Sequence, residues 1–286
     1  MIYDATPCEL GEGALWHPGQ QALFWFDILH KRLHMKSAAG LTVWEMPDLT
    51  SAAGILSQDE LVLASESALW RFDIPTGSQT RLVALDADDS RTRSNDGRAD
   101  RQGGFWIGTM GKRGPHDPGR GAIWRYHKGE LRKLFPGLTI PNSICFSPGG
   151  GYVHFSDTVT QKVWRVALDA DGWPKAEPQL YLDLTAQGLY PDGAVMAADG
   201  TFWNAQWGAG RVAAYAPDGT FLRAISFEGS AQTSCPAFGG ADLTTLFCTS
   251  ALEGMDTATR AANPNAGNTF AALGVTQGLP EPVVIL

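Results

Sequence analysis

The chain has 286 residues, 44% of them apolar, and carries 22 Lys and Arg against 30 Asp and Glu, a formal net charge of −8. This composition allows a large core and excludes global disorder, and the acidic balance argues against a nucleic-acid partner or an anionic membrane surface. No run approaches the roughly 18 apolar residues of a membrane helix, and the first residues, 1–8, resemble no targeting leader. We therefore expect a cytoplasmic protein; the oligomeric state is left open.

Short apolar runs recur in the same internal order along the whole chain, separated by Gly, Asp and Pro turns. In each unit a first run leads through a turn into a second, and a third and fourth follow. The second runs fall at 22–26, 61–64, 105–108, 152–155, 202–204 and 246–248. The third runs fall at 32–35, 68–72, 122–126, 162–166, 211–215 and 269–272. The fourth runs fall at 41–45, 80–83, 131–135, 179–182, 220–224 and 282–286.

Four antiparallel strands repeated six times predict an all-β, six-bladed β-propeller built as a single domain over residues 1–286. A sandwich of short strands is the alternative, but it would not explain six copies in one order. Connections at 85–94, 109–121 and 251–268 are expected to be loops, and no long helix is predicted. Residues 282–286 are expected to close the last blade, with Ile2 and Tyr3 beside them. The four cysteines show no C-x-x-C spacing and are interpreted as buried thiols.

One polar position recurs in every unit, seven residues before a turn residue. The innermost strands of a propeller surround its central channel, so these positions should converge on a ring at one end. Asp and Asn often only form local Asx turns at strand starts, but the shared position favours a site that holds a hard divalent cation through oxygen ligands. The six residues are Glu12, Ser51, Asn95, Asn142, Asp192 and Ser234.

Several motifs resemble the regucalcin/gluconolactonase family of six-bladed propellers, which includes sugar lactonases. They are Leu10-Gly-Glu-Gly-Ala-Leu-Trp16, Arg93-Ser-Asn-Asp-Gly97, Phe105-Trp-Ile-Gly-Thr-Met110, Ile140-Pro-Asn-Ser143, Ser147-Pro-Gly-Gly150, Pro191-Asp-Gly193 and Ala237-Phe-Gly-Gly240. The resemblance implies one divalent metal bound by Glu12, Asn142 and Asp192, and substrate contacts by Arg93 and Asn95. Ca²⁺ is the first expectation, and Zn²⁺, Mn²⁺, Mg²⁺ or iron would also suit.

The sequence departs from the family pattern at three places. Ala14 stands where Pro is usual, and Ser143 stands where Gly commonly follows the metal-site Asn. Both residues are small and leave the ligands intact. The segment 111–113 reads Gly-Lys-Arg where some relatives carry an acidic substrate contact, so that contact does not transfer.

The function expected from these residues is metal-dependent hydrolysis of an aldono- or aldarolactone to the sugar acid, with a small-molecule sugar lactone as the partner. Asp192 is assigned as a metal ligand and as the general base. The alternative is that a metal-bound hydroxide attacks the lactone without Asp192 acting as a base. Alternatives are a propeller esterase or phosphotriesterase and a non-catalytic calcium-binding propeller.

A positive stretch accompanies these motifs. Its members are Arg91, Arg93, Arg98, Arg101, Lys112, Arg113 and Arg120. It is interpreted as loop charge paired with nearby Asp residues. The alternative is that Arg93, with Lys112 or Arg113, receives a substrate carboxylate.

Overall fold

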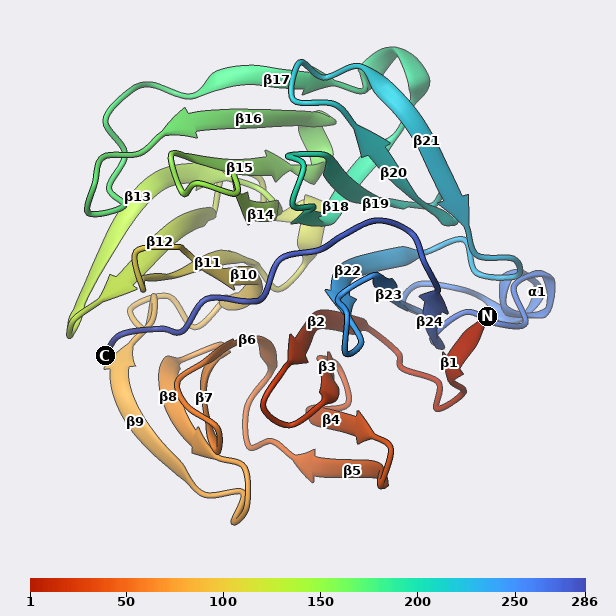
Figure 1. Ribbon diagram of the computed structural model, residues 1–286, viewed down its shortest axis with the longest axis horizontal. Coiled ribbons are helices and arrows are strands. Elements are labelled where there is room, and N and C mark those ends of the chain that lie inside the picture. Colours follow the sequence, from red (N-terminus) through yellow and green to blue (C-terminus); the bar gives the residue numbers. More distant parts are fainter.

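The computed structural model describes residues 1–286 and consists of six four-stranded antiparallel sheets arranged around a central channel (Figure 1). The predicted six-bladed propeller is therefore confirmed. Blade 1 is β2 (Gly11–His17), β3 (Ala22–Asp27), β4 (Arg32–Ser37) and β5 (Gly40–Glu45). Blade 2 is β6 (Thr50–Ile55), β7 (Glu60–Ser65), β8 (Ala68–Asp73) and β9 (Gln79–Ala84).

The next three blades repeat the same order, with the first strand of each beside the channel. Blade 3 is β10 (Thr92–Ala99), β11 (Phe105–Gly111), β12 (Gly121–His127) and β13 (Glu130–Leu138). Blade 4 is β14 (Pro141–Phe146), β15 (Tyr152–Asp157), β16 (Lys162–Ala167) and β17 (Gln179–Asp183). Blade 5 is β18 (Tyr190–Met196), β19 (Phe202–Trp207), β20 (Arg211–Tyr215) and β21 (Phe221–Ser226).

Blade 6 closes the ring with both ends of the sequence. It consists of β22 (Thr233–Gly239), β23 (Thr245–Ser250), β24 (Thr269–Ala272) and β1 (Ile2–Asp4). The fourth strand is thus the N-terminal β1, whose Ile2 lies opposite Phe270. The prediction that 282–286 would form this strand was wrong. Ile2 and Tyr3 do join the last blade as predicted, but beside β24 rather than beside 282–286. A strand from the other terminus fills that edge, which joins the last blade to the first.

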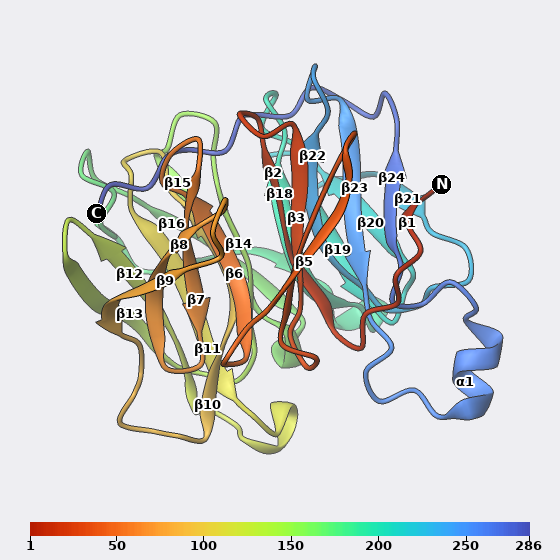
Figure 2. The same cartoon turned by 90° about the horizontal axis from the view of Figure 1, so that it is seen from below.

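The C-terminal segment instead crosses the end of the channel where the inner strands finish. The backbone N–H of Val284 donates to Ile55 O at 2.8 Å, and that of Ile285 donates to Gly103 O at 2.8 Å. Figures 1 and 2 show this segment in dark blue, spanning the ring on the face opposite to α1 (Thr257–Ala262). Val284 anchors the segment, since its side chain is buried in the same core cluster as Phe105, whereas Val283, Ile285 and Leu286 are exposed.

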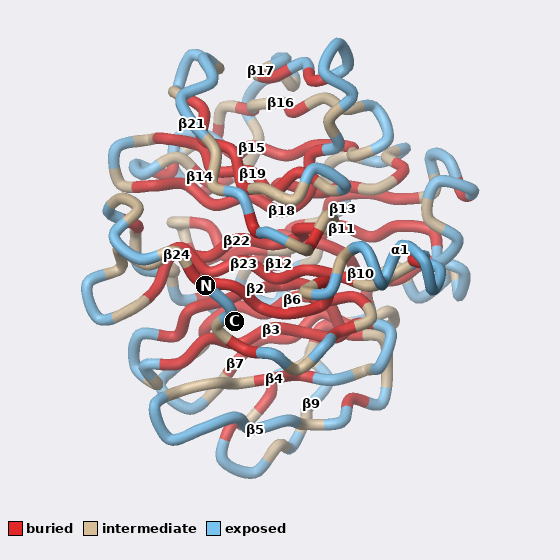
Figure 3. The backbone as a smooth tube through the Cα atoms, turned by 90° about the vertical axis from the view of Figure 1, so that its right-hand side faces the viewer, coloured by how far each residue is buried: buried red, intermediate tan, exposed pale blue.

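Burial decreases from the channel outward, as the strand sequences dictate. The inner strands β2, β6 and β14 are buried along their whole length, whereas the outer strand β5 is almost wholly exposed (Figure 3). Second-strand tryptophans such as Trp25, Trp106 and Trp203 are fully buried between neighbouring sheets. All four cysteines are buried free thiols, as predicted.

The remaining structure is short. It comprises α1, which falls inside the predicted loop 251–268, and three 3-10 turns, η1 (Gly114–His116), η2 (Thr158–Thr160) and η3 (Thr185–Gln187). No helix has the length and apolar character needed to cross a bilayer.

Candidate active site

Every inner strand carries an irregularity in its pairing at the position of the predicted polar column. The register shifts lie between Glu12 and Leu15, Thr50 and Ala52, Ser94 and Gly97, Asn142 and Cys145, Pro191 and Ala194, and Thr233 and Pro236. Such bulges bend a strand and re-aim its side chains. Because each inner strand has its bulge at the same end of the channel, the polar side chains there depart from the regular in–out alternation of a β-strand.

Two bulges need a left-handed backbone. Gly13 has φ +61°, and a Cβ on it would lie 2.2 Å from Ser51 O, so only glycine fits there. Ser143 has φ 59°, which is costly for a residue with a side chain. Its hydroxyl offsets that cost by donating to Asp192 O at 2.5 Å, while accepting from Asn204 Nδ2 at 3.1 Å. Ser143 therefore ties blade 4 to the strand that carries Asp192.

A chain of hydrogen bonds links the predicted substrate contacts with a predicted metal ligand. Arg93 Nη1 donates to Asn95 Oδ1 at 3.0 Å, and Asn95 Nδ2 donates to Asn142 Oδ1 at 3.0 Å. Asn142 Nδ2 in turn donates to Thr158 Oγ1 at 2.8 Å, and Thr158 Oγ1 donates to Pro191 O at 2.8 Å. The chain runs from blade 3 through blade 4 to blade 5 and ends one residue before Asp192.

The carboxylates of Glu12 and Asp192 are buried, with 7% and 4% of their surface exposed, and neither forms an ion pair. Burial raises the pKa of Asp192 well above its usual value, and the Glu12 carboxylate raises it further. Burial, followed by the Asp96 carboxylate, likewise raises the pKa of Glu12 to about 8. Acidic groups from blades 1, 3 and 5 are thus close enough to oppose one another's ionisation.

Arg93 is the cation among these carboxylates. Its guanidinium is buried, which lowers its pKa, and the carboxylates of Glu253, Glu12 and Asp192 act in the opposite direction. Only Nη1 is engaged by the protein, at Ser94 O and Asn95 Oδ1. The remaining donors of Arg93 are therefore available to a bound molecule.

Ser51 and Ser234, the two serines of the polar column, form hydrogen bonds between inner strands. The Ser51 hydroxyl donates to Asn95 O at 2.6 Å, and the Ser234 hydroxyl donates to Gly11 O at 2.5 Å. Both bonds join one inner strand to the next across a blade boundary. The two serines, which were not among the three predicted metal ligands, thus hold adjacent blades together.

Three further residues belong to the site and were not singled out from the sequence. Thr158 orients the Asn142 amide. Asp96 is buried beside Asn95 and accepts from the Ile144 N–H at 2.7 Å. Glu253, in the β23–β24 connection, acts electrostatically on Arg93. Only Asp96 had a usable signal, its place within a quoted motif.

The loop cations are paired with acids. Lys112 contacts Glu66 and also donates to Ser90 O at 2.8 Å. Arg113 is 72% exposed and pairs with Asp117 at 2.5 Å. The interpretation as paired loop charge fits Lys112 and Arg113, each of which already has an acidic partner.

The donor set suits one hard divalent cation. No group of three or more His, Cys, Asp or Glu side chains is arranged for a metal. The predicted set has only two carboxylates and is completed by the amide oxygen of Asn142, which retains a free lone pair beside its bond from Asn95. Two unpaired buried carboxylates with an amide oxygen offer the oxygen chemistry that Ca²⁺, Mg²⁺ and Mn²⁺ prefer.

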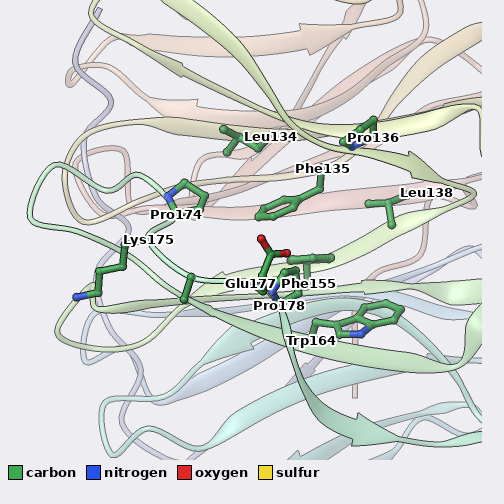
Figure 4. Close-up of a pocket in the computed structure, with 11 residues that line it drawn as sticks. Leu134, Phe135, Pro136, Leu138, Phe155, Trp164, Pro174, Lys175, Glu177 and Pro178 are labelled. Carbon is green, nitrogen blue, oxygen red and sulfur yellow. The ribbon is translucent and has the colours of Figure 1, made fainter.

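A groove lies elsewhere on the molecule. This groove of about 810 Å³ is formed by β13, β15, β16 and the 174–178 connection, with Phe135, Phe155 and Trp164 in its wall (Figure 4). Its walls come from outer parts of blades 3 and 4, and none of the predicted site residues lines it.

Comparison with known proteins gives consistent matches. The family model described as SMP-30/Gluconolactonase/LRE-like region matches residues 10–252. A Rhizobium meliloti (strain 1021) protein, provisionally named a sugar lactone lactonase, is 38% identical over 278 residues, covering 96% of this chain and 93% of the relative. The L-arabinolactonase of Azospirillum brasilense is 34% identical over 268 residues, covering 92% and 88% of the two chains.

A solved structure matches over the full length. It is described as a calcium-binding protein, regucalcin, from Agrobacterium tumefaciens, and superposes with a TM-score of 0.96 at 39% identity, covering 100% of this chain and 97% of the other.

Proposed function

The chain belongs to the SMP-30/gluconolactonase/LRE-like family, and from this premise we propose that it hydrolyses a sugar lactone to the sugar acid with the help of one divalent cation. Glu12, Asn142 and Asp192 would hold the cation. Two observations support the proposal. The Glu12 and Asp192 carboxylates are buried without ion pairs and Glu12 raises the pKa of Asp192, and the Asn142 amide oxygen is bonded to Asn95, which also holds Arg93.

Lactone opening needs a polarised carbonyl and an activated water. A divalent cation at this site would polarise the carbonyl and acidify the water. Asp192 would accept the proton from the attacking water, because its buried carboxylate has no ion-pair partner in the protein and burial raises its pKa well above its usual value. Its backbone carbonyl accepts hydrogen bonds from Ser143 and Asn204, which fixes the backbone that carries the carboxylate.

Arg93 and Asn95 would bind the substrate. The unengaged donors of Arg93 suit hydroxyl or carbonyl oxygens of a sugar lactone. Asn95 is already bonded on both sides, so its main work would be to hold Arg93 and Asn142 at a fixed separation. Relatives named for L-arabinolactone and for 6-deoxy-6-sulfogluconolactone support the sugar-lactone class.

A lactone panel run with and without a chelator tests the proposal. We expect ring opening of sugar lactones that a chelator abolishes and an added divalent cation restores. Turnover that is insensitive to the chelator would contradict the role of the cation. Activity on phosphotriesters or simple esters alone would instead indicate a propeller esterase, and cation binding without any turnover would indicate a binding protein.

A further inference from the structure

Glu253 lies at the channel end that carries the candidate site. Its loop connects β23 to β24 and contains α1, on the face opposite to the C-terminal segment (Figure 2). The loop backbone is fixed on both sides of the residue, because Leu252 N–H donates to Glu9 O at 3.0 Å and Gln232 Nε2 donates to Glu253 O at 3.1 Å. The carboxylate is therefore presented from an ordered position.

The Glu253 carboxylate has no hydrogen-bond or ion-pair partner within the protein, although the residue is partly buried. Burial raises its pKa, the nearby Arg93 guanidinium lowers it and Glu9 raises it. A half-buried carboxylate without a partner loses solvation that nothing in the protein replaces. A ligand hydroxyl that donates to it would restore that interaction.

Arg93 and Glu253 come from opposite blades. Arg93 begins β10 in blade 3 and Glu253 follows β23 in blade 6, and these blades lie across the ring from one another (Figure 1). Glu253 is the carboxylate with the strongest electrostatic effect on Arg93, yet the two form no ion pair or hydrogen bond. Arg93 therefore retains free donors and Glu253 a free acceptor near the same channel end.

The surroundings of Glu253 are unsuited to a negative charge on the substrate. Lys112 and Arg113 are paired with Glu66 and Asp117. Arg93 is a buried cation at this end, and the carboxylates of Glu253, Glu12 and Asp192 already act on it. A substrate carboxylate directed toward Glu253 would meet like charge across a partly buried space, where repulsion is screened less than in water.

We propose that Glu253 determines substrate specificity: it accepts hydrogen bonds from lactone hydroxyls opposite Arg93 and excludes lactones that carry a free carboxylate. The inference rests on the proposed lactonase function and narrows its substrate class to neutral, polyhydroxylated lactones. Among charged side chains in the channel mouth, Glu253 serves substrate selection, whereas Asp192 serves the reaction itself.

The test compares D-gluconolactone with a glucarolactone bearing one free carboxylate, in the wild-type protein and in Glu253→Gln. We expect the wild type to favour the neutral lactone in kcat/KM. Glu253→Gln should raise KM for the neutral lactone several-fold with little change in kcat, because the interaction is with the bound sugar. It should also shift the neutral-to-charged preference by about tenfold toward the charged lactone, which corresponds to about 1.4 kcal/mol.

Glu228→Gln is the matched control, since Glu228 is an exposed carboxylate at the same end of the propeller. It should leave KM and the preference unchanged. Glu253→Ala serves as a second variant if the glutamine retains hydroxyl binding, and circular dichroism confirms folding. A wild-type preference for the charged lactone, or unchanged KM and preference in both Glu253 variants, overturns the inference while leaving lactonase activity intact. Absence of any lactone opening would instead overturn the proposed function together with it.

Discussion

The two ends of the central channel differ in whether their buried charged groups form ion pairs. At the end where the inner strands begin, Glu12 and Asp192 are buried without ion pairs, and bulges direct the surrounding polar residues. At the other end, the buried Arg98 is paired with Glu281 of the C-terminal segment. A buried charge without an ion pair lowers stability, so we interpret such charges as ligand-binding groups. A buried ion pair instead joins two segments of the structure.

The far end is also filled with apolar contacts. Val284 packs in the core beside Phe105, and Ile285 lies so close to Gly103 that a Cβ on that glycine would be 2.6 Å from the isoleucine side chain. The lesson is that one end is built for packing and the other for binding. Changes at the two ends should therefore separate activity from stability.

The largest effect on activity is expected from Asp192→Asn. This variant keeps the shape of the side chain but removes its charge, so turnover should fall by roughly 10²–10⁴-fold, the range for loss of a general base. The fold should persist, because a repelled carboxylate is removed from beside Glu12. Steady-state kinetics and thermal unfolding check this, and wild-type turnover in the variant would contradict the assignment.

The largest effect on stability is expected from Glu281→Ala, which leaves Arg98 buried and unpaired. The free energy of unfolding should fall by about 3–5 kcal/mol, measured by denaturant titration. Activity per folded molecule should be retained, since the segment lies at the far end. Glu130→Ala is the control: its pair with Arg132 is exposed and its loss should cost less than about 1 kcal/mol. An equal loss of unfolding free energy in Glu281→Ala and Glu130→Ala would contradict the difference expected between the buried and the exposed ion pair.

A smaller effect is expected from Thr158→Val, which deletes the hydroxyl between Asn142 and Pro191. Residues that orient metal ligands typically contribute about 10–100-fold to metal affinity. Calorimetric titration with Ca²⁺ should therefore show at least a roughly tenfold rise in Kd. Thr160→Val supplies a control from the same turn, because that hydroxyl bonds only to Asp157 O. An unchanged Kd in Thr158→Val would exclude the positioning role.

The smallest effect is a pH dependence of stability in the absence of cations. Burial raises the pKa of Glu12 from 4.5 to about 8, so the folded state holds this proton more tightly than the unfolded state. The folded state is then favoured below pH 4.5 and loses this contribution as the pH rises toward 8. With a chelator, Tm should fall by a few degrees between pH 5.5 and 8, and excess Ca²⁺ should reverse the fall. A Ca²⁺-independent decrease would argue against a cation at Glu12.

The repeat made most of the fold predictable, because six copies of one strand order leave few alternatives. The closing strand of blade 6 was less predictable, because Ile2–Asp4 and 282–286 are both short apolar segments. Only packing decides which of them pairs with the edge of the blade. The C-terminal segment finds its partners, Ile55 and Gly103, on blades far from it in sequence. Nothing local in the sequence specifies such contacts.

The candidate site was predictable where the column and the motifs coincided. Glu12, Asn142 and Asp192 occupy equivalent bulges, so their shared spacing carried the information. Ser51 and Ser234 share the spacing but bond to neighbouring strands, because a short hydroxyl reaches the adjacent carbonyl. Thr158 and Glu253 lie outside the repeat, in connections whose path depends on the whole ring, so no pattern pointed to them.

The central claim is that Glu12, Asn142 and Asp192 hold a single divalent cation. Anomalous diffraction from crystals soaked in Mn²⁺ tests it most directly. The account predicts one strong peak at the channel end where the inner strands begin, contacted by oxygens of those three side chains, and its loss in Asp192→Asn. A peak bound by other residues, or no peak at saturating Mn²⁺, would contradict it.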